Sequence, residues 1–291
     1  MSRQQKAYAL VLAAILLWST AGSAFKISLR FISAPQLLLL ASFFSLVFLI
    51  AWKTAEGKLA SCFLISRREL TRSAIMGLMN PFAYYIILFE AYNRLLAQEA
   101  VALNYIWPVM LVLLSIPVLK QKIGLWSILA LLISFSGLIM IILKGNFSGI
   151  TLSDPLGIFL ALVSSVFWAS FWLMNIKDKR EEAAKLLVNF IFGFIYVLIY
   201  VLVFDRRIGF NHEGILGGIY IGLFEMGLTY VLWLKGLSMS TTTAKVSNLV
   251  YISPFLSLMF VSIAVGETIY WYTVLGLMMI IGGIILQRVV K

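Results

Sequence analysis

Long apolar stretches alternate with short polar connections along the whole chain. Ten stretches are apolar over about 20 residues, the length that an α-helix needs to cross the hydrocarbon core of a bilayer. They cover residues 7–25, 34–52, 73–93, 97–119, 124–143, 155–176, 185–204, 214–236, 241–265 and 270–287. The pattern predicts an all-α integral membrane protein with ten transmembrane helices. The residues that remain are too few for a folded soluble domain.

Weak sequence matches recur between the two halves of the chain at a nearly constant offset. The pairs are Trp18 and Trp168, Gly77 and Gly222, Tyr85 and Tyr230, Ala91 and Gly236, and Gly137 and Gly283, at offsets of 145 to 150 residues. They predict a duplicated five-helix unit, with repeats at 1–146 and 147–291. Because five is odd, the second copy enters the membrane from the opposite side. Inverted repeats are typical of secondary transporters, which bind substrate between the halves near the membrane midplane.

The fourth apolar stretch carries a proline within the segment LNYIWP at residues 103–108. Pro108 has no N–H to donate to the carbonyl of Asn104. Within a bilayer, an unpaired acceptor is tolerated only beside other protein groups or a watered cavity. We therefore expect Asn104, Tyr105 and Trp107 to offer an amide, a phenol and an indole to an internal site. The alternative is a packing kink whose aromatic residues fill space.

Two other stretches repeat this combination of a proline with polar and aromatic neighbours. In the ninth, Tyr251 precedes Pro254 by three residues. The same spacing separates Tyr105 from Pro108 in the fourth. In the third, Asn80, Pro81 and Tyr84 lie at spacings that place them on one helix face. The three prolines predict kinked helices around a common cavity.

A carboxylate lies near the middle of the eighth stretch. Three glycines spaced by four residues run from Gly214 to Gly222, and the same helical face continues through Glu225 and Trp233. Glycines indicate close packing on protein, so we expect Glu225 to point inward. A carboxylate at this depth is costly and usually functional. It can carry a proton, hold the ammonium group of a substrate or pair with a basic residue such as Lys245. The alternative is a protonated Glu225 bonded to a neighbouring helix.

Composition and charge agree with a membrane protein. The chain is 62% hydrophobic and 12% charged, which excludes an ordinary soluble domain. Its net charge of +11 does not indicate nucleic-acid binding, because no exposed domain is left to carry it. With the N-terminus in the cytoplasm, 17 of the 23 Lys and Arg residues fall on the inner side and 6 on the outer. The positive-inside rule then predicts two cytoplasmic termini.

The sequence favours neither an intramembrane enzyme nor a metal site. An intramembrane enzyme needs a nucleophile with a base, or a metal site, inside the spans. His212, beside Asp205 and Glu213, and the single Cys62 lie outside the predicted spans. We expect neither a metal nor a cofactor. We also reject a cleaved N-terminal signal peptide, because its removal would leave nine spans and destroy the repeat.

The chain resembles the EamA-type members of the drug/metabolite transporter superfamily over essentially its whole length. The matching residues are Tyr230, Pro254 and Val265-Gly266-Glu267 in the second half, and Glu90-Ala91-Tyr92, Gln98-Glu99-Ala100 and Asn104-Tyr105-Ile106-Trp107-Pro108 in the first. The first-half segments are similar to the bacterial aromatic amino-acid exporter branch. The resemblance implies ten helices in two inverted five-helix repeats, with residues 104–108 lining or shaping a central cavity. Glu225 matches no motif of the branch.

These observations predict a secondary transporter that exports amino acids, aromatic or otherwise apolar, or similar small amphipathic metabolites. The predicted substrate-binding residues are Trp18, Asn80, Tyr84, Asn104, Tyr105, Trp107, Trp168, Glu225, Trp233 and Tyr251. Glu225 is also the candidate for proton coupling, and Pro81, Pro108 and Pro254 are the predicted kinks. The expected partners are the substrate, the lipid bilayer and a proton, with no nucleic acid. By the resemblance we expect the protein in the bacterial inner membrane, as a monomer or weak dimer.

Three alternative functions remain open at this point. An exchanger of nucleotide-like or other anionic metabolites needs converging positive charge, and the spans offer only Lys235 and Lys245, both near an end. An exporter of cationic drugs would use the same aromatic residues and Glu225. A non-transporting scaffold would need none of them.

Overall fold

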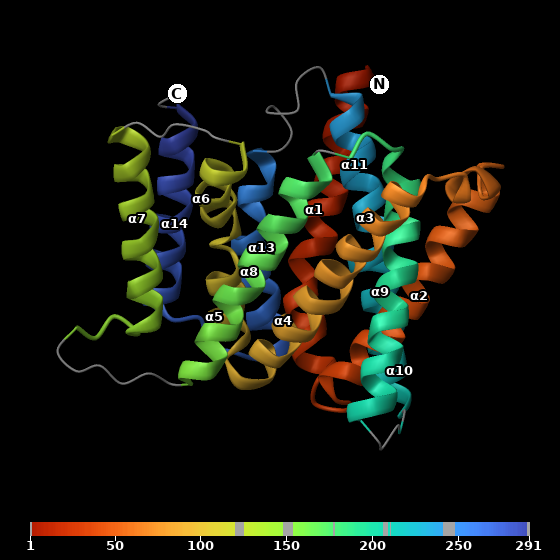
Figure 1. Ribbon diagram of the computed structural model, residues 1–291. Helices are drawn as coiled ribbons and strands as arrows, with labels where there is room; N and C mark the ends of the chain where they lie inside the picture. The colour runs from red at the N-terminus through yellow and green to blue at the C-terminus, as the bar shows by residue number, and fades with distance from the viewer. Residues whose placement is uncertain are drawn as a thin grey trace.

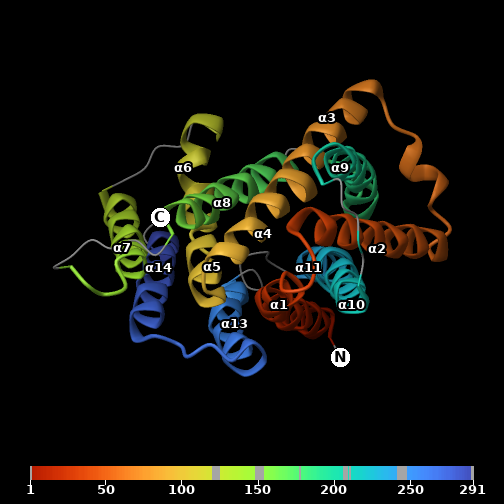
Figure 2. The same ribbon diagram turned by 90° about the horizontal axis from the view of Figure 1, so that it is seen from below.

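The computed structural model describes residues 2–119, 125–147, 154–176, 178–205, 209, 211–240 and 248–289. Within these ranges the chain forms helices and no strands (Figures 1 and 2). The α-helices are α1 (Arg3–Ser28), α2 (Ala34–Ala55), α3 (Arg67–Gly77), α4 (Tyr84–Arg94), α5 (Ala97–Asn104), α6 (Trp107–Leu119), α7 (Leu125–Ile142), α8 (Pro155–Ile176), α9 (Glu182–Phe204), α10 (His212–Tyr220), α11 (Thr229–Met239), α13 (Ser253–Phe260) and α14 (Trp271–Val289). Short 3-10 or π-helical segments lie at Ala60–Phe63, Leu78–Ala83, Ile221–Leu228, Asn248–Ile252 and Val261–Val265.

Seven helical runs in the described part of the chain are long and apolar enough to cross a membrane. They are Arg3–Ser28, Ala34–Ala55, Arg67–Arg94, Ala97–Pro117, Pro155–Asn175, Glu182–Phe204 and His212–Met239. Shorter apolar helices, Ile128–Ile142, Leu249–Val265 and Trp271–Leu286, lie in the fifth, ninth and tenth predicted stretches. The all-helical, multi-pass architecture is confirmed. The count of ten spans and the inverted repeat remain predictions, and residues 241–247 of the ninth stretch lie outside the described residues.

Serine residues fix where the first three helices begin. The hydroxyls of Ser2, Ser33 and Ser66 each accept a hydrogen bond from the backbone N–H three residues later. These bonds satisfy donors that a helix leaves free in its first turn. The two ends of the chain lie at the same end of the bundle (Figure 1), which we call the terminal end.

The helices break close to the predicted prolines. Between α3 and α4, Asn80 leaves helical geometry with φ −151° and ψ 120°, directly before Pro81. The chain turns between α5 and α6, so that Pro108 occupies the first turn of α6. Pro254 likewise lies in the first turn of α13. In the first turn of a helix the missing N–H of proline costs little.

Two of the regularly spaced glycines of the eighth stretch, Gly218 and Gly222, pack against α2. A Cβ on Gly218 would lie 2.4 Å from Cβ of Leu40, and one on Gly222 would lie 2.5 Å from the carbonyl oxygen of Ala41. Gly227 also faces α2, against Phe48, because the π-helical segment adds a residue to the turn. The expectation that Glu225 continues the glycine face is therefore wrong. The wider π-helical turn leaves the glycines on α2, while Glu225 still points inward.

The fifth and tenth stretches pack on each other, as their small residues predict. A Cβ on Gly137 would lie 2.4 Å from the carbonyl oxygen of Gly276, and one on Gly283 would lie 2.4 Å from that of Ala130. Ser134 donates a hydrogen bond of 3.1 Å to the carbonyl of Ile280. Both views show α7 and α14 side by side at one flank of the bundle (Figures 1 and 2). Neither of these two helices lines the candidate site.

Candidate functional site

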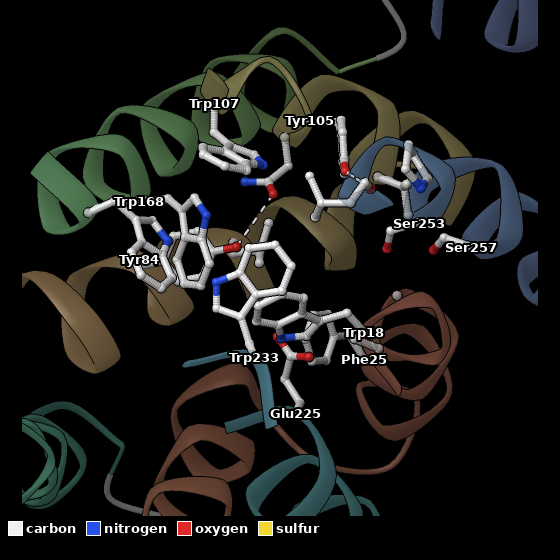
Figure 3. Close-up of a pocket in the computed structure, with 18 of the residues that line it drawn as sticks. Trp18, Phe25, Tyr84, Tyr105, Trp107, Trp168, Glu225, Trp233, Ser253 and Ser257 are labelled. Carbon is white, nitrogen blue, oxygen red and sulfur yellow. Dashed lines mark hydrogen bonds between the residues drawn. The ribbon is translucent and has the colours of Figure 1, made fainter. Parts of the chain in front are cut away.

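A cavity of about 390 Å³ lies between helices from both halves of the chain. Its walls come from α1, α4, α5, α6, α8, α11 and α13, with the start of α9, the π-helical segment Ile221–Leu228 and the 3-10 segment Asn248–Ile252. Eight of the predicted site residues line it, namely Trp18, Tyr84, Asn104, Tyr105, Trp107, Trp168, Glu225 and Trp233. Figure 3 labels all of them except Asn104, together with Ser253 and Ser257 of α13. The sequence thus predicted residues that the fold brings together from distant parts of the chain.

One wall of the cavity is a cluster of aromatic rings around Trp168. Its ring centroid lies 4.6 Å from that of Tyr84 and 6.5 Å from that of Trp107, the latter in an edge-on arrangement. The edge of Trp168 also meets Tyr230 at 5.9 Å. Such offset or edge-on pairs are favourable beyond simple burial. The rings are therefore held in place before any ligand arrives.

A second aromatic wall is built around Trp18 of α1. Its ring lies 5.2 Å from Trp233 and 6.0 Å from the same Tyr230 that contacts Trp168. Trp18 and Trp168, which match each other between the halves, therefore share one buried tyrosine. Both aromatic walls line the same cavity.

Hydrogen bonds hold the polar side chains in place on the side of the cavity formed by α5. The amide of Asn104 donates a hydrogen bond of 2.8 Å to Ser164 and accepts one of 3.4 Å from the hydroxyl of Tyr84. The hydroxyl of Tyr105 donates to the carbonyl of Val250 (Figure 3). These bonds fix both side chains at the break between α5 and α6.

Glu225 enters the cavity from the π-helical segment and is only 7% exposed. Its Oε1 accepts a hydrogen bond of 3.1 Å from the hydroxyl of Tyr85. Its Oε2 is buried and has no hydrogen-bond partner among the described residues. A buried carboxylate oxygen without a donor is costly, so this position is suited to a ligand or a proton.

Two predicted site residues do not line this cavity. Asn80 is fully buried, and its amide donates a hydrogen bond of 3.1 Å to the hydroxyl of Tyr230. The non-helical backbone at Asn80 breaks the helical periodicity on which its prediction rested. Tyr251 is also buried, within the 3-10 segment Asn248–Ile252. Of the predicted kinks, Pro254 lines the cavity, whereas Pro81 and Pro108 do not.

Several lining residues escaped the sequence analysis. They include Gly22, Phe25, Tyr92, Trp172, Asn175, Glu182 and Ser257. Helical spacing could have found two of them, because Trp172 follows Trp168, and Ser257 follows Ser253, by one turn. No sequence pattern indicated Gly22, although a Cβ there would lie 2.8 Å from the hydroxyl of Tyr92.

The charge of the cavity is negative in the part of the chain that the structure describes. Its lining contains the carboxylates of Glu182 and Glu225 and no Lys, Arg or His. Lys235 lies instead over the ring of Trp52, 5.4 Å from its centroid. Lys245, the other basic residue considered for the spans, lies outside the described residues.

Hydrogen bonds tie the helices together at the end of the bundle away from the chain termini. The ammonium group of Lys26 donates to the carbonyls of Tyr92 and Leu95, at 2.6 and 2.5 Å. The carboxylate of Glu267 accepts from the first two N–H groups of α5, at 2.7 and 3.1 Å. Gln98 donates to the carbonyl of Thr268 at 2.8 Å. We call Lys26, Gln98 and Glu267 the distal clasp.

The cavity extends instead toward the terminal end, where it reaches Asn175 and Glu182. The connection between these residues is held by Asp178 and Arg180, whose side chains approach to 2.6 Å. Arg180 also donates a hydrogen bond of 2.9 Å to Ser73 of α3. Burial raises the pKa of the Asp178 carboxyl, but the hydrogen bonds and charge of Arg180 outweigh it, and the net pKa lies below its ordinary value.

Known proteins resemble this chain in sequence and in fold. The model of the EamA-like transporter family matches residues 5–143 and 155–288. An uncharacterized transporter of Archaeoglobus fulgidus is 22% identical over 285 residues, which cover 97% of this chain and 96% of the relative. An uncharacterized transporter of Clostridium kluyveri is 27% identical over 176 residues, which cover 58% of this chain and 56% of the relative.

One solved crystal structure shares the fold, with a TM-score of 0.70 and 19% sequence identity over 99% of both chains. At this identity the likeness concerns the fold alone. The relatives are named as transporters without a substrate, so the narrower resemblance to aromatic amino-acid exporters remains a prediction.

Proposed function

The chain belongs to the EamA-like transporter family, and on this basis we propose that it exports amino acids or similar small amphipathic metabolites as a secondary transporter. Its relatives are named as transporters, and the chain is not an enzyme. We propose alternating access as the mechanism, with the segments 1–146 and 147–291 as two inverted repeats that move against each other.

The observation that carries this proposal is the aromatic cavity between the halves. It combines apolar rings, which suit the body of an amphipathic molecule, with a few fixed polar groups that can orient it. It reaches the terminal end while the distal clasp joins the helices at the other end. This arrangement is the one expected of a transporter open to one side at a time.

Counterflow in proteoliposomes tests the proposal. Vesicles loaded with unlabelled compound should accumulate the labelled form, across a panel of amino acids and amines. Trp107→Ala should lower this exchange by about tenfold or more, because it removes a wall of the cavity. The matched control is Trp126→Ala, since Trp126 lies on α7, is 57% exposed and does not line the cavity. Absence of exchange for the entire panel, with folded parent protein, would contradict transport.

We propose that Glu225 couples transport to protons. Its unpaired Oε2 can hold a proton when no substrate occupies the cavity. Flux should then depend on a pH gradient in the parent protein and lose this dependence in Glu225→Gln. Equal dependence in the two proteins removes Glu225 from the role.

We propose that the protein works in the bacterial inner membrane with both termini in the cytoplasm, as a monomer or weak dimer. The location of both termini at one end of the bundle supports this topology (Figure 1). The terminal end would then be the cytoplasmic side, from which an exporter loads. A reporter fused to either terminus should be active only in the cytoplasm.

Two of the alternative functions make different predictions. An exchanger of anionic metabolites is disfavoured by the two carboxylates that line the cavity and by the absence of basic residues from its described lining. A scaffold predicts that Trp107→Ala and Glu225→Gln leave flux unchanged at normal protein level. The counterflow assay separates both from the main proposal.

A further inference from the structure

This inference rests on the proposed function and concerns the charge of the substrate. We propose that the cavity binds small amines with an aromatic or apolar body in their cationic form. It prefers them to zwitterionic amino acids that carry the same ring.

The first element of the site is the free oxygen of Glu225. The hydroxyl of Tyr85 occupies Oε1, and Oε2 lacks a partner among the described residues although the side chain is more than nine-tenths buried. A buried carboxylate is stabilised most by a charged donor that replaces its lost hydration. A substrate ammonium group supplies both the charge and the N–H.

The second element is the set of rings around this carboxylate. Glu225 lies with Trp18, Phe25 and Trp233 at one side of the cavity in Figure 3. The faces of aromatic rings attract cations, and indole does so most strongly. Tyr84 and Trp168 line the same cavity and lie 4.6 Å apart, and the apolar part of a bound amine would pack on their rings. Carboxylate and rings therefore favour the same positively charged group.

The third element is the lack of a positively charged partner for a substrate carboxylate. The described lining holds no Lys, Arg or His, and its second charged residue is the carboxylate of Glu182. Its donors are neutral hydroxyl, amide and indole groups, and the bond to Ser164 already uses one N–H of Asn104. A zwitterion would thus place its carboxylate among like charges, whereas an amine brings none. A volume of about 390 Å³ lies within the range of about 300–1,000 Å³ typical of small-molecule sites.

A series of compounds that share one phenyl ring and a short chain tests the charge preference. The series comprises phenethylamine as the cation, phenylalanine as the zwitterion, phenethyl alcohol as the neutral form and hydrocinnamate as the anion. Each competes at neutral pH for counterflow of labelled phenethylamine and, in parallel, of labelled phenylalanine. We expect half-inhibition by the amine at a concentration about tenfold or more below that of phenylalanine, with hydrocinnamate weakest.

Variants locate the preference within the cavity. Glu225→Gln removes the charge at nearly constant shape and should bring the amine and the alcohol to similar affinities. Glu90→Gln is the matched control, because Glu90 pairs with Arg94 at the surface and does not line the cavity. Lys245→Gln tests the basic residue outside the described ranges and should leave the preference intact. If Glu225→Gln fails to fold, the compound series on the parent protein still decides the question.

Ligand-induced thermal stabilisation of the purified protein separates binding from transport. Exchange of phenylalanine or hydrocinnamate equal to that of the amine would overturn the inference and leave the proposed function standing. An unchanged preference in folded Glu225→Gln, or its reversal in Lys245→Gln, would also overturn it. Stabilisation by the amine alone, with no exchange of any compound, would support the inference and contradict the proposed function. Neither stabilisation nor exchange would contradict both.

Discussion

The hydroxyl of Tyr85 donates a hydrogen bond of 3.1 Å to Oε1 of Glu225, in the other half of the chain. Tyr230, which corresponds to Tyr85 at an offset of 145 residues, accepts a bond of 3.1 Å from Asn80. The same offset relates Asn80 to Glu225. Each bond therefore joins one half to the other, and the two bonds involve equivalent positions, as is expected of related repeats. The halves differ in that one presents an amide and the other a carboxylate.

Removing the hydroxyl of Tyr85 should destabilise the protein. Tyr85→Phe leaves a buried carboxylate without its described donor, which costs about 1–3 kcal/mol. Tyr230→Phe removes a bond between neutral groups and should cost less, about 0.5–1.5 kcal/mol. Unfolding in detergent, followed by intrinsic fluorescence, measures both. The control is Tyr200→Phe, whose ring packs on Phe82 and Phe204 away from the cavity. Equal effects of all three substitutions would contradict this account of the two bonds.

The contact between α9 and the kink at Pro81 should not tolerate a methyl group. A Cβ on Gly193 would lie 2.3 Å from Cδ of Pro81, so Gly193→Ala should cost about 1–3 kcal/mol of unfolding free energy. Gly282→Ala is the matched control, because no atom lies within 4 Å of its added Cβ. Thermal unfolding of the two variants side by side measures the difference. Similar stabilities would show that the kink shifts easily.

Acid should weaken the connection between α8 and α9. The pKa of Asp178 is lower in the folded protein than its ordinary value of 3.8, so its carboxylate stabilises the fold above that pH. This contribution is lost as the pH falls through the lower folded-state pKa. Asp178→Asn should cost about 1.5–3 kcal/mol at neutral pH, and the gap to the parent should shrink below about pH 4. A gap that stays constant with pH would argue against an ionised Asp178.

Loosening the distal clasp should open the cavity at the end away from the termini. Glu267→Gln removes the charge that binds the first N–H groups of α5. In a Cys62→Ser background, a cysteine replacing Ser257 in the cavity wall should react faster with an impermeant thiol reagent applied from that end. We expect a rise of about fivefold, the change that about 1 kcal/mol makes in an equilibrium. Glu90→Gln is again the control, and an equal rise there would refute the role of the clasp.

The sequence predicted the membrane architecture and most of the cavity for identifiable reasons. Long apolar stretches are the dominant signal, and Trp18, Trp168 and Glu225 stood out because indoles and carboxylates are conspicuous inside spans. Asn80 was predicted to line the cavity because helical periodicity was extended through a point where the backbone leaves the helix. The π-helical segment before α11 separates Glu225 from the glycine face for a related reason, since its spacing differs from the assumed period.

Contacts between residues far apart in sequence could not be predicted. The distal clasp joins Gln98 to residues about 170 positions later, and no local sequence pattern predicts such a partner. The sequence predicted no contact for Lys26, one of the six basic residues assigned to the outer side, although its ammonium group ties α1 to the end of α4. Residues of this kind become visible only when the fold brings them together.

The difference between Asn80 and Glu225 also bears on the energy of the transport cycle. If the halves exchanged conformations and were chemically alike, the inward-open and outward-open forms would be equally stable. Of the pair Asn80 and Glu225, only Glu225 can gain or lose a charge, and its surroundings would change as the halves move. The two resting orientations then differ in free energy by the cost of moving that charge from one environment to the other. Such a protein favours one orientation even when concentrations on both sides of the membrane are equal.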